Sequence, residues 1–352
     1  MDIATPSRIP SHPPFIDREL LARIMGLDDY LHAVEAAFRA HANCRTAQPM
    51  PLHIELDGGG FHAKGAYVGL RHDYVAVKVN SNFPGNPARG LPTIQGAVLL
   101  YDASDGRLLA ILDSMEITSK RTAAASALAA RHLARPEAST IAICGCGEQG
   151  RAQLAAIARV RPLEHAHAWD ADPARAREFA AQMSRALGME VFDVADLHEA
   201  TASCDIIVTA TTARTPFLAR ECVRPGTFIA AIGADNPHKS ELHPELFAGT
   251  KVVVDSLEQA AAMGDLHHAL ANPCEGAGSL VHAELAEIVA NRKPGRTNDD
   301  EITIFDSTGL AIQDVASAAL AYESWARRLD SSCRRRPRSI AAKAGWASAS
   351  PW

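Results

Sequence analysis

The feature that most constrains the fold is a regular alternation of short apolar runs with alanine-rich stretches, from residue 139 to residue 305. Six apolar runs predict buried strands, at residues 140–144, 166–170, 205–211, 227–232, 251–255 and 302–305. Strands that alternate with helices are typical of a parallel sheet with helices on both faces. The sequence therefore predicts a doubly wound α/β domain in this part of the chain.

The first predicted strand ends in a loop that contains Gly145, Gly147 and Gly150. This spacing is typical of the Rossmann dinucleotide loop, in which glycines allow a tight turn, admit the pyrophosphate and pack the helix against the strand. Asp170 ends the next predicted strand, where a carboxylate accepts hydrogen bonds from ribose hydroxyls and repels a 2′-phosphate. We therefore expect NAD as the cofactor rather than NADP. The alternative is a tight glycine turn that binds no nucleotide.

The first third of the chain has a different pattern. Residues 17–42 carry apolar side chains at spacings of three and four, with a break near Gly26, which predicts two helices. Residues 51–113 contain short β-like runs, including 74–79 and 95–101, which indicate an antiparallel sheet. Alanine-rich residues 118–135 predict a long helix, and residues 310–329 predict a closing one. The expected fold class is thus α/β, with a Rossmann-type doubly wound parallel sheet plus an α+β domain.

Composition and net charge indicate which kinds of binding partner to expect. The net charge is -6 and the pI is about 6.2, so the folded body has no general positive field, and we expect neither nucleic acid nor membrane as a partner. No apolar stretch approaches the ~20 residues that span a bilayer. The seven cysteines are scattered without a CxxC pair, and no signal-peptide core is seen, so we expect a cytoplasmic protein. No set of acids and histidines has metal-ligand spacing, so we expect no metal.

Polar residues follow several predicted strands, where ligands bind in open α/β sheets. Thr211, Asp235, Ser307 and Thr308 each come after such a strand. Asp235 lies in a loop after Gly233 and is a candidate acid or base. The alternative for Asp235 is a structural role, capping the turn before the following proline.

Four cations of the N-terminal part suit a substrate that bears a carboxylate: Arg45, Lys64, Lys78 and Arg121. Lys78 shares a strand face with Ala76 and Asn80, opposite the valine face, and is therefore expected to point into a cleft. The alternative for each cation alone is an ordinary surface charge.

Four separated motifs, at residues 113–127, 143–150, 232–242 and 305–314, together resemble the ornithine cyclodeaminase/mu-crystallin family. The resemblance extends from about residue 17 to residue 329. It implies a homodimer that exchanges hydride between NAD(P) and the α-carbon of an amino or imino acid, a small-molecule substrate. It also implies a substrate-binding and dimerisation domain over residues 1–120, an NAD-binding domain over 121–308 and a returning helix over 309–330. Residues 331–352, a basic tail rich in serine and alanine, are expected to be disordered.

The resemblance also implies roles for individual residues. Arg45, Lys78 and Arg121 look like the set that binds the substrate carboxylate. Asp235 is similar to the catalytic aspartate of the family, and Lys78 would help it to manage the proton on the substrate nitrogen. Thr308 falls beside the substrate. The residues expected to contact the dinucleotide, with the three loop glycines, are Thr93, Glu148, Gln149, Asp170, Thr211, Lys239 and Ser307.

The sequence departs from the family pattern in one place. Relatives often have Met-Pro where this chain has Lys64 and Gly65, and the ornithine enzymes have a glutamate near His62, where no acid is available here. Lys64 would repel the distal ammonium of ornithine and favour an acidic or neutral side chain. The expected function is therefore an imine or ketimine reductase or amino-acid dehydrogenase. Two alternatives are an ornithine cyclodeaminase that forms proline and ammonia, and a non-catalytic crystallin-like binding protein, against which Asp235 argues.

Overall fold

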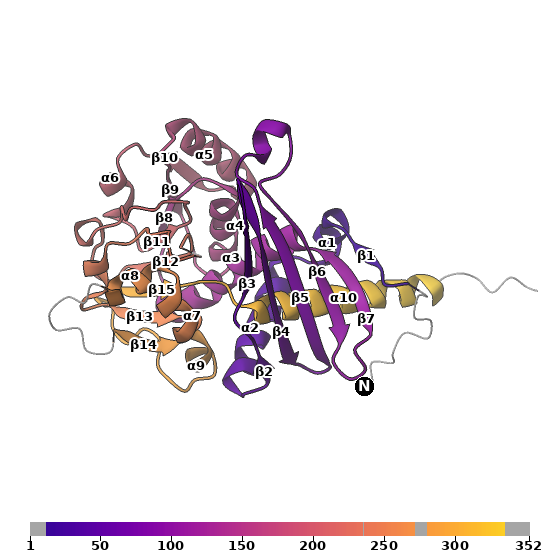
Figure 1. The fold of residues 1–352 in the computed structure, drawn as a ribbon. Helices are drawn as coiled ribbons and strands as arrows, with labels where there is room; N and C mark the ends of the chain where they lie inside the picture. The colour runs from indigo at the N-terminus through magenta and orange to yellow at the C-terminus, as the bar shows by residue number, and fades with distance from the viewer. Residues whose placement is uncertain (1–11, 235, 272–279, 335–352) are drawn as a thin grey trace, which may run out of the picture.

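The computed structural model describes residues 12–234, 236–271 and 280–334, which form two lobes side by side, each built around one sheet (Figure 1). The first sheet comes from the N-terminal part of the chain, and the second from the alternating segment. Helix α3 (Ser114–Leu133) packs against elements of both lobes.

The second sheet has eight parallel strands in the order β10-β9-β8-β11-β12-β15-β13-β14. Their bounds are β8 Thr140–Cys144, β9 His165–Trp169, β10 Glu190–Asp193, β11 Ile206–Thr209, β12 Phe228–Ala231, β13 Lys251–Val254, β14 Val281–Glu284 and β15 Thr303–Asp306. All six predicted strands are therefore confirmed, each with ends shifted by no more than two residues. The two strands that the sequence did not predict, β10 and β14, lie at the edges of the sheet, where alternate side chains are polar or exposed and no continuous apolar run is needed.

Helices cover both faces of this sheet, and each face has its own apolar core. One face packs against α3, α4 and α5, and the other packs against α6 and the segments around η3 and α8. The bounds are α4 Glu148–Ile157, α5 Pro173–Leu187, α6 Leu197–Thr201, α7 Leu257–Ala262, α8 Asp265–Ala271 and α9 Leu285–Val289, with 3-10 turns η2 Arg220–Cys222 and η3 Pro244–Phe247. The predicted Rossmann-type, doubly wound fold is confirmed.

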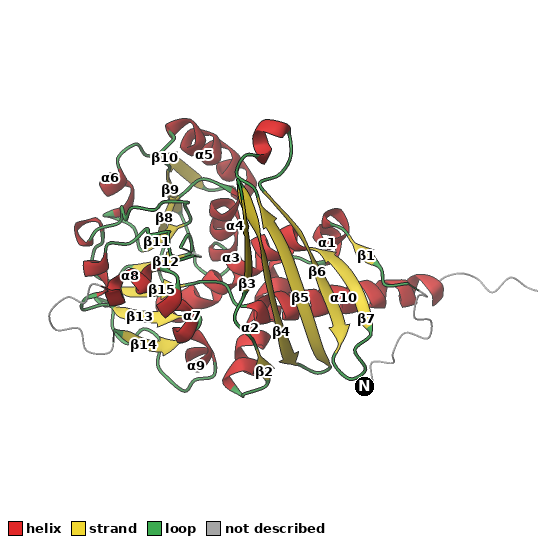
Figure 2. Ribbon diagram, in the orientation of Figure 1, coloured by secondary structure: helices red, strands yellow, loops and turns green. Residues whose placement is uncertain are grey.

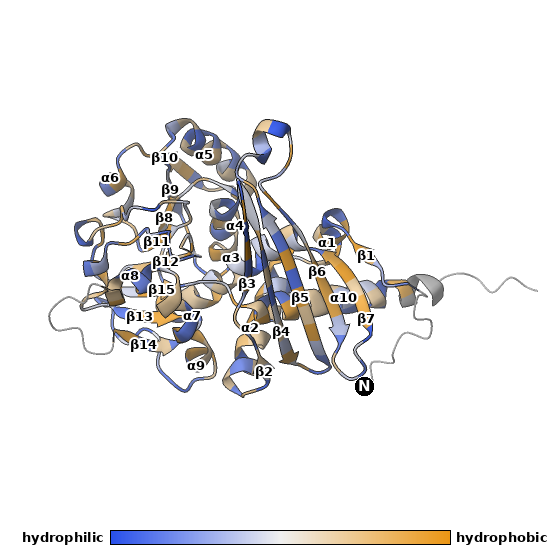
Figure 3. Cartoon of the chain, viewed as in Figure 1, coloured by the Kyte–Doolittle hydropathy of each residue, from blue (hydrophilic) through white to orange (hydrophobic). Residues whose placement is uncertain are grey.

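The first sheet has the order β1-β7-β6-β5-β4-β2, and β3 also pairs with β4. Its bounds are β1 Phe15–Ile16, β2 Thr46–Ala47, β3 Leu52–Leu56, β4 Gly59–Gly69, β5 Asp73–Asn82, β6 Ile94–Asp102 and β7 Leu108–Asp113, with the 3-10 turn η1 Asn86–Arg89 between β5 and β6. The antiparallel pairing predicted for residues 51–113 is confirmed, and the short β1, which was not predicted, joins β7 in parallel. Buried positions alternate with partly buried ones along β5 from Asp73 to Lys78, and the strand carries both hydrophobic and hydrophilic residues (Figure 3).

Among the described residues, helices pack on one face of the first sheet and leave the other face open, and α10 lies across its strands (Figure 2). The bounds are α1 Arg18–Ile24, α2 Leu27–Ala42, α3 Ser114–Leu133 and α10 Ala311–Arg334. The two predicted N-terminal helices are confirmed, and α3 begins four residues before its predicted start because the Asp113 side chain accepts a hydrogen bond from the Glu116 amide, 2.9 Å away, and caps it.

The predicted division of the chain at residues 120 and 308 stays a prediction, because α3 spans the first of these positions and packs against both lobes. The closing helix predicted over 310–329 extends to Arg334. Of the predicted basic tail, residues 335–352 lie outside the described residues. No helix in the described ranges combines the length and the hydropathy needed to cross a membrane.

Candidate active site

The glycine loop joins β8 to α4 and has the geometry of a phosphate cradle. Gly145 has a φ of 108°, and a Cβ on it would lie 2.6 Å from the Ala210 carbonyl oxygen, so only glycine fits. A Cβ on Gly150 would lie 2.2 Å from the Gly145 carbonyl oxygen, which explains the close packing of helix on strand. A Cβ on Gly147, by contrast, would meet no atom within 4 Å. Gly147 therefore faces open space at the N-terminus of α4, where backbone amides favour a phosphate.

Asp170 lies at the rim of this loop, directly after β9. Its Oδ2 accepts a hydrogen bond from the Cys146 amide at 2.9 Å, and its Oδ1 accepts one from the Asp172 amide at 3.0 Å. These bonds fix the carboxylate beside the glycine loop, where the adenosine ribose of a dinucleotide would lie. The residues present therefore fit a bound NAD.

Glu241 is a buried carboxyl that ties two strand-end loops together. Its Oε1 accepts hydrogen bonds from the amide and the hydroxyl of Thr211, both at 2.6 Å, and its Oε2 accepts one from the Gly233 amide at 2.8 Å. Burial raises the pKa of the Glu241 carboxyl to about 7, and the nearby Asp265 adds to the rise. Thr211 thus supports the loop beyond β11 and does not line the cavity that lies between the two lobes.

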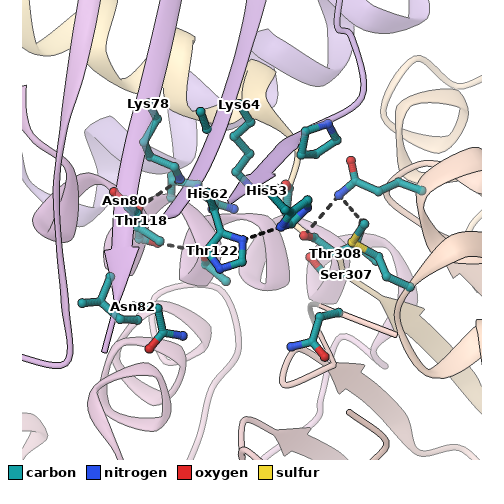
Figure 4. Close-up of a pocket in the computed structure, with 18 of the residues that line it drawn as sticks. His53, His62, Lys64, Lys78, Asn80, Asn82, Thr118, Thr122, Ser307 and Thr308 are labelled. Carbon is teal, nitrogen blue, oxygen red and sulfur yellow. Dashed lines mark hydrogen bonds between the residues drawn. The ribbon is translucent and has the colours of Figure 1, made fainter. Parts of the chain in front are cut away.

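A cavity of about 250 Å³ lies between the lobes (Figure 4). From the first lobe it is lined by strand residues and by one face of α3. From the second lobe it is lined by Gln149 in the first turn of α4, by Asn236 and by the segment from Ser307 to Gly309 that follows β15. The carboxyl ends of the parallel strands therefore face the first sheet across this cavity, as expected for a ligand site in an open α/β sheet.

Asp255 shapes the segment after β15. Its buried carboxylate accepts hydrogen bonds from the Thr308 amide and hydroxyl, both at 2.8 Å, and from the Gly309 amide at 2.6 Å. Gln259 adds a bond from its Nε2 to the Thr308 hydroxyl at 2.9 Å. Thr308 is thus held in one orientation at the cavity wall.

Lys78, Arg121 and Asp314 form a buried ionic group behind the cavity. Asp314 Oδ1 accepts hydrogen bonds from Lys78 Nζ and Arg121 Nε, both at 2.9 Å. Lys78 Nζ also donates to the Thr118 hydroxyl at 3.1 Å, and Arg121 Nη1 donates to Gln313 Oε1 at 2.9 Å. Lys78 and Arg121 are each only 3% exposed, yet both line the cavity. Both cations are therefore held rigidly at its wall.

Burial and the neighbouring charges shift the pKa values of Lys78 and Asp314. Burial lowers the pKa of Lys78 well below 10.5, although Asp314 opposes the shift, and Arg121 and Lys64 lower it further. Burial also disfavours ionised Asp314, but Arg121 and Lys78 outweigh it and hold the pKa of Asp314 at about 2. Asp314 is therefore the fixed anion of the group, and Lys78 can release a proton more readily than an ordinary lysine.

Lys64, His53 and His62 line the same cavity from β3 and β4. Lys64 Nζ donates to the Gly309 carbonyl oxygen at 2.6 Å, which links the two lobes. The Nδ1 atoms of His53 and His62 lie 2.6 Å apart, so one imidazole donates a hydrogen bond to the other (Figure 4).

The structure brings together six of the residues proposed from sequence for the substrate and cofactor: Lys64, Lys78, Arg121, Gln149, Ser307 and Thr308. Gly145, Gly147, Glu148, Gly150 and Asp170 gather at the adjoining glycine loop, where the Glu148 carboxylate accepts a hydrogen bond from the Ser119 hydroxyl at 3.4 Å. Asp235 lies outside the described residues. Thr93 and Lys239 do not line the cavity, although their neighbours Ile94 and Asn236 do.

Arg45 is not brought to this group. It precedes β2, which pairs with the far end of β4, so Arg45 lies beside Gly69, about 16 Å along the strand from Lys64 at ~3.3 Å per residue. Its Nη2 donates to the Leu70 carbonyl oxygen at 3.0 Å and lies 3.5 Å from Asp73. Arg45 therefore does not line the cavity, and its expected role beside Lys78 and Arg121 stays a prediction.

Sequence reasoning missed several contributors to the site: His53, Asn80, Asp255, Gln259 and Asp314. The alternation along 74–79 that placed Lys78 in the cleft applies equally to Asn80, and Asp314 lies inside the last family motif. His53 had no such signal, because its place beside His62 depends on the register of β3 with β4. In the described part of the chain, no group of three or more His, Cys, Asp or Glu side chains is placed to hold a metal ion.

Comparison with known proteins decides the family. A model of the ornithine cyclodeaminase/mu-crystallin family matches residues 19–328. The chain belongs to this family. The predicted recognition is thereby confirmed, over the same length of chain as the four motifs indicated.

Three solved structures from the family are similar to this chain. An archaeal alanine dehydrogenase dimer with bound NAD is 37% identical, with a TM-score of 0.85, and the match covers 90% of this chain and 97% of that one. The Δ1-pyrroline-2-carboxylate reductase of Thermococcus litoralis, in complex with NADH and L-proline, is 36% identical, with a TM-score of 0.83 and coverages of 90% and 98%. The iminosuccinate reductase of Paracoccus denitrificans, in complex with NAD⁺, is 30% identical, with a TM-score of 0.81 and coverages of 90% and 97%.

Proposed function

We propose that this protein reduces an α-imino acid to an amino acid in the cavity between its lobes, with NADH as the reductant, or catalyses the reverse oxidation. It is an NAD(P)-dependent oxidoreductase of the ornithine cyclodeaminase/mu-crystallin family, as its relatives confirm. The observation that carries the proposal is the buried group of Lys78, Arg121 and Asp314, which faces the ends of the Rossmann strands across the cavity.

The glycine loop would hold the cofactor. Gly147 leaves room for the pyrophosphate at the N-terminus of α4, and Asp170 would accept hydrogen bonds from the adenosine ribose. When bound, NAD(H) supplies or accepts the hydride that the α-carbon exchanges. We keep NAD as the cofactor, with NADP less favoured because Asp170 would repel a 2′-phosphate.

Arg121 and Lys78 would bind the substrate carboxylate. Nε and Nη1 of Arg121 donate to Asp314 and Gln313, and these bonds fix the plane of the guanidinium. Its Nη2 makes no hydrogen bond to any of the described residues. A guanidinium held in this way can offer its remaining N–H donors to a carboxylate without losing further freedom. Thr308, fixed by Asp255 and Gln259, would orient the substrate from the other lobe.

The proton balance assigns a second role to Lys78. Reduction of the C=N bond adds a hydride at the α-carbon and a proton at nitrogen. Lys78 Nζ, whose pKa burial lowers, can supply that proton, and Asp314 then stays as the anion beside it. The predicted catalytic residue Asp235 would share this task, and this role remains a prediction.

The test is an NADH-oxidation screen of the purified protein. Pyrroline-2-carboxylate, piperideine-2-carboxylate and 2-oxo acids with ammonia or methylamine are the substrates, with L-ornithine and NAD⁺ alongside. The proposal predicts NADH oxidation with at least one imino acid, and Lys78→Met should lower kcat by about 10²–10⁴-fold. Ammonia release from ornithine without net NADH change would favour the cyclodeaminase alternative. No turnover with any substrate, together with NADH binding, would favour a non-catalytic binding protein.

We further propose a homodimer. The face of the first sheet that carries no helices exposes a row of large apolar side chains, and an archaeal relative is a dimer. The exposed residues are Leu52, Ile54, Leu56, Phe61 and Val79. A contiguous apolar face of this kind is typical of a protein interface.

The described cysteines carry free thiols, which fits the predicted cytoplasmic location.

A further inference from the structure

A second cavity, of about 520 Å³, lies on the helix side of the first lobe. Its walls are one face of α2, one face of α10 and the turn from β4 to β5, and it shares no lining residue with the cavity between the lobes. Its volume falls within the roughly 300–1,000 Å³ that is typical of small-molecule sites. The second cavity is therefore large enough to hold a ligand of its own.

Alanines form the floor of the second cavity, where α2 packs against α10. Ala33 and Ala40 of α2 and Ala316 and Ala319 of α10 line it, and each is at most 7% exposed. Side chains this short leave a hollow between the two helices and offer only methyl groups to a ligand. The floor therefore suits an apolar part of a small molecule.

Arginines surround this floor. Four of the lining residues are arginines, whereas Glu323 is the one acid among the described residues that line the cavity. Glu323 already accepts a hydrogen bond from the Tyr74 hydroxyl at 2.8 Å. The wall of the second cavity therefore carries an excess of positive charge.

Two acids just outside the second cavity do not balance this excess. Glu35 lies 2.8 Å from Arg39 of the wall, but it is shared with Arg131 at 3.6 Å. Asp73 lies 3.5 Å from Arg45, another arginine of the wall. With Glu35, Asp73 and Arg131 all included, the arginines still outnumber these acids.

Arg45 is set into the wall beside the turn from β4 to β5. Its Nη2 donates to the Leu70 carbonyl oxygen at 3.0 Å, and a Cβ on Gly69 would lie 3.0 Å from both Nε and Nη2. The φ of Gly69 is not positive, so a glycine serves here to leave space for the guanidinium and not to permit a backbone turn. The Arg45 side chain is still 54% exposed, so its remaining N–H donors can reach a ligand.

Arg327 supplies donors from the opposite wall, on α10. Its Nη2 donates to the Ser324 hydroxyl at 3.0 Å, and it forms no ion pair within the part of the chain that the structure describes. Guanidinium groups therefore line the second cavity from two sides, Arg45 from the sheet and Arg327 from a helix. Such an arrangement suits an anion with several acceptor oxygens.

Helix α10 holds its wall in place before any ligand binds. On α10, Glu323 follows Asp314 by nine residues, and on β5, Tyr74 precedes Lys78 by four. Because a helix rises about 1.5 Å and a strand about 3.3 Å per residue, both spans are about 13 Å. Helix α10 is therefore bound to β5 at two matched points, Lys78 with Asp314 and Tyr74 with Glu323. A wall fixed in this way lowers the entropic cost of binding.

We infer that the second cavity binds a phosphate monoester with a small apolar body. The phosphate accepts hydrogen bonds from Arg45 and Arg327, and the apolar body lies on the alanine floor. A phosphate monoester carries about 1.5–2 negative charges at pH 7, against one for a carboxylate, and so matches the excess of arginine better. The inference does not depend on the proposed function, although the site lies on the helix that carries Asp314.

The experiment measures binding to the full-length protein by isothermal titration calorimetry. Phenyl phosphate is the probe, with benzoate and inorganic phosphate as comparisons. The protein is saturated with NAD⁺, which occupies the glycine loop, and the buffer has low ionic strength because salt screens exposed guanidinium groups. We expect one phenyl phosphate per chain, with a Kd about tenfold lower than that of either comparison. No saturable binding, or equally tight binding of benzoate or inorganic phosphate, overturns the inference.

Two variants assign the binding to the second cavity. Arg327→Met should raise the Kd of phenyl phosphate about tenfold, and Arg327→Lys, which keeps the charge without the planar fork, should raise it less. Ala36 of α2 also lines the cavity, and Ala36→Leu should weaken binding by filling the floor with no change of charge. Neither position is fully buried, so circular dichroism should show both variants folded. Unchanged affinity in both variants contradicts the inference.

Two control variants separate this site from other positive charges. Arg177→Met removes an exposed arginine of α5, 3.8 Å from Asp193 and outside both cavities, and should leave the Kd unchanged. Lys78→Met removes a cation from the cavity between the lobes and should also leave it unchanged. An equal loss of affinity in Arg177→Met and Arg327→Met would indicate general charge attraction only. A loss in Lys78→Met without one in Arg327→Met would place the ligand between the lobes. Either result overturns the inference.

Discussion

At the scale of single residues, Asp314 decides the chemistry of the site. It is the one carboxylate in direct contact with both Lys78 and Arg121 among the described residues, and all three are buried. A buried ion pair contributes little net stability, but removal of one partner leaves an uncompensated charge in a medium of low polarity. The placement of the two cations therefore depends on Asp314.

We predict that Asp314→Asn lowers the free energy of unfolding by about 3–5 kcal/mol, because Lys78 and Arg121 stay buried without their anion. Urea denaturation followed by circular dichroism measures the loss. The matched control is the double variant Asp314→Asn with Lys78→Met, in which one of the two stranded cations is also absent. It should be more stable than Asp314→Asn alone, and a further loss of stability in the double variant would contradict this account.

Glu241 gives the protein a pH-dependent component of stability. Its pKa is raised from 4.5 to about 7, so between these values the folded state binds more protons than the unfolded state. The free energy of unfolding then falls as pH rises through this window. We predict that Glu241→Gln, which does not titrate, lacks this fall. Urea titrations at pH 5, 6.5 and 8 should show the stability of wild type relative to the variant decreasing with pH, and a constant difference would refute the assignment.

Residues of the site differ in how far the sequence could predict them. Lys78, Arg121 and Thr308 were predicted because they lie within a strand, a helix and a strand end that local patterns reveal. His53 was not, since its place depends on the register of β3 with β4, which is set by pairing and not by local preference. The place of Arg45 away from the cavity could not be predicted for the same reason, because β2 pairs at the far end of β4.

At the scale of elements, the strongest prediction from sequence was the strand, glycine loop and helix from β8 to α4. The buried strands β8, β11, β12, β13 and β15 were found because a central parallel strand needs a continuous apolar run. The edge strand β10 has a single buried residue, Val191, and so leaves no such signal. The two-residue β1 is too short to show any period.

The glycine loop provides a matched pair of variants. Gly147→Ala adds a methyl group that meets no protein atom within 4 Å, whereas Gly150→Ala places one 2.2 Å from the Gly145 carbonyl oxygen. We predict that Gly147→Ala keeps the melting temperature within a few degrees and weakens NADH binding at least tenfold, because the methyl group occupies the pyrophosphate position. Gly150→Ala should instead lose about 1–3 kcal/mol of stability. NADH titration by fluorescence measures the affinity. An unchanged affinity in Gly147→Ala would contradict the binding of the pyrophosphate at this loop.

At the scale of the whole molecule, the site exists because two lobes meet. The first sheet supplies the cations, the second supplies the strand ends, and the bond from Lys64 to the Gly309 carbonyl crosses between them. The sequence predicted both sheets but not their relative placement, which follows from the packing of α3 against both lobes. The 2.6 Å bond from Lys64 to Gly309 could therefore not be read from any local pattern.

The open face of the first sheet predicts self-association. Ile54 is 51% exposed on β3, and we expect it to lie within the dimer interface. Ile54→Lys should shift the protein from dimer to monomer in analytical ultracentrifugation, because a charge would be buried in an apolar contact. Leu257 of α7, similarly exposed at 47%, is the control, and Leu257→Lys should leave the dimer intact. A dimer that survives Ile54→Lys would place the interface elsewhere.

We propose that hydride passes between the nicotinamide and the α-carbon of an imino acid held in the cavity. The most direct measurement uses NADH stereospecifically deuterated at C4, a 2-oxo acid and ammonia, with mass spectrometry and NMR of the amino acid formed. With the deuterium on the transferred face, we predict one deuterium at the α-carbon for each NADH consumed. Amino acid that forms without deuterium from either C4 epimer of the labelled NADH would contradict it.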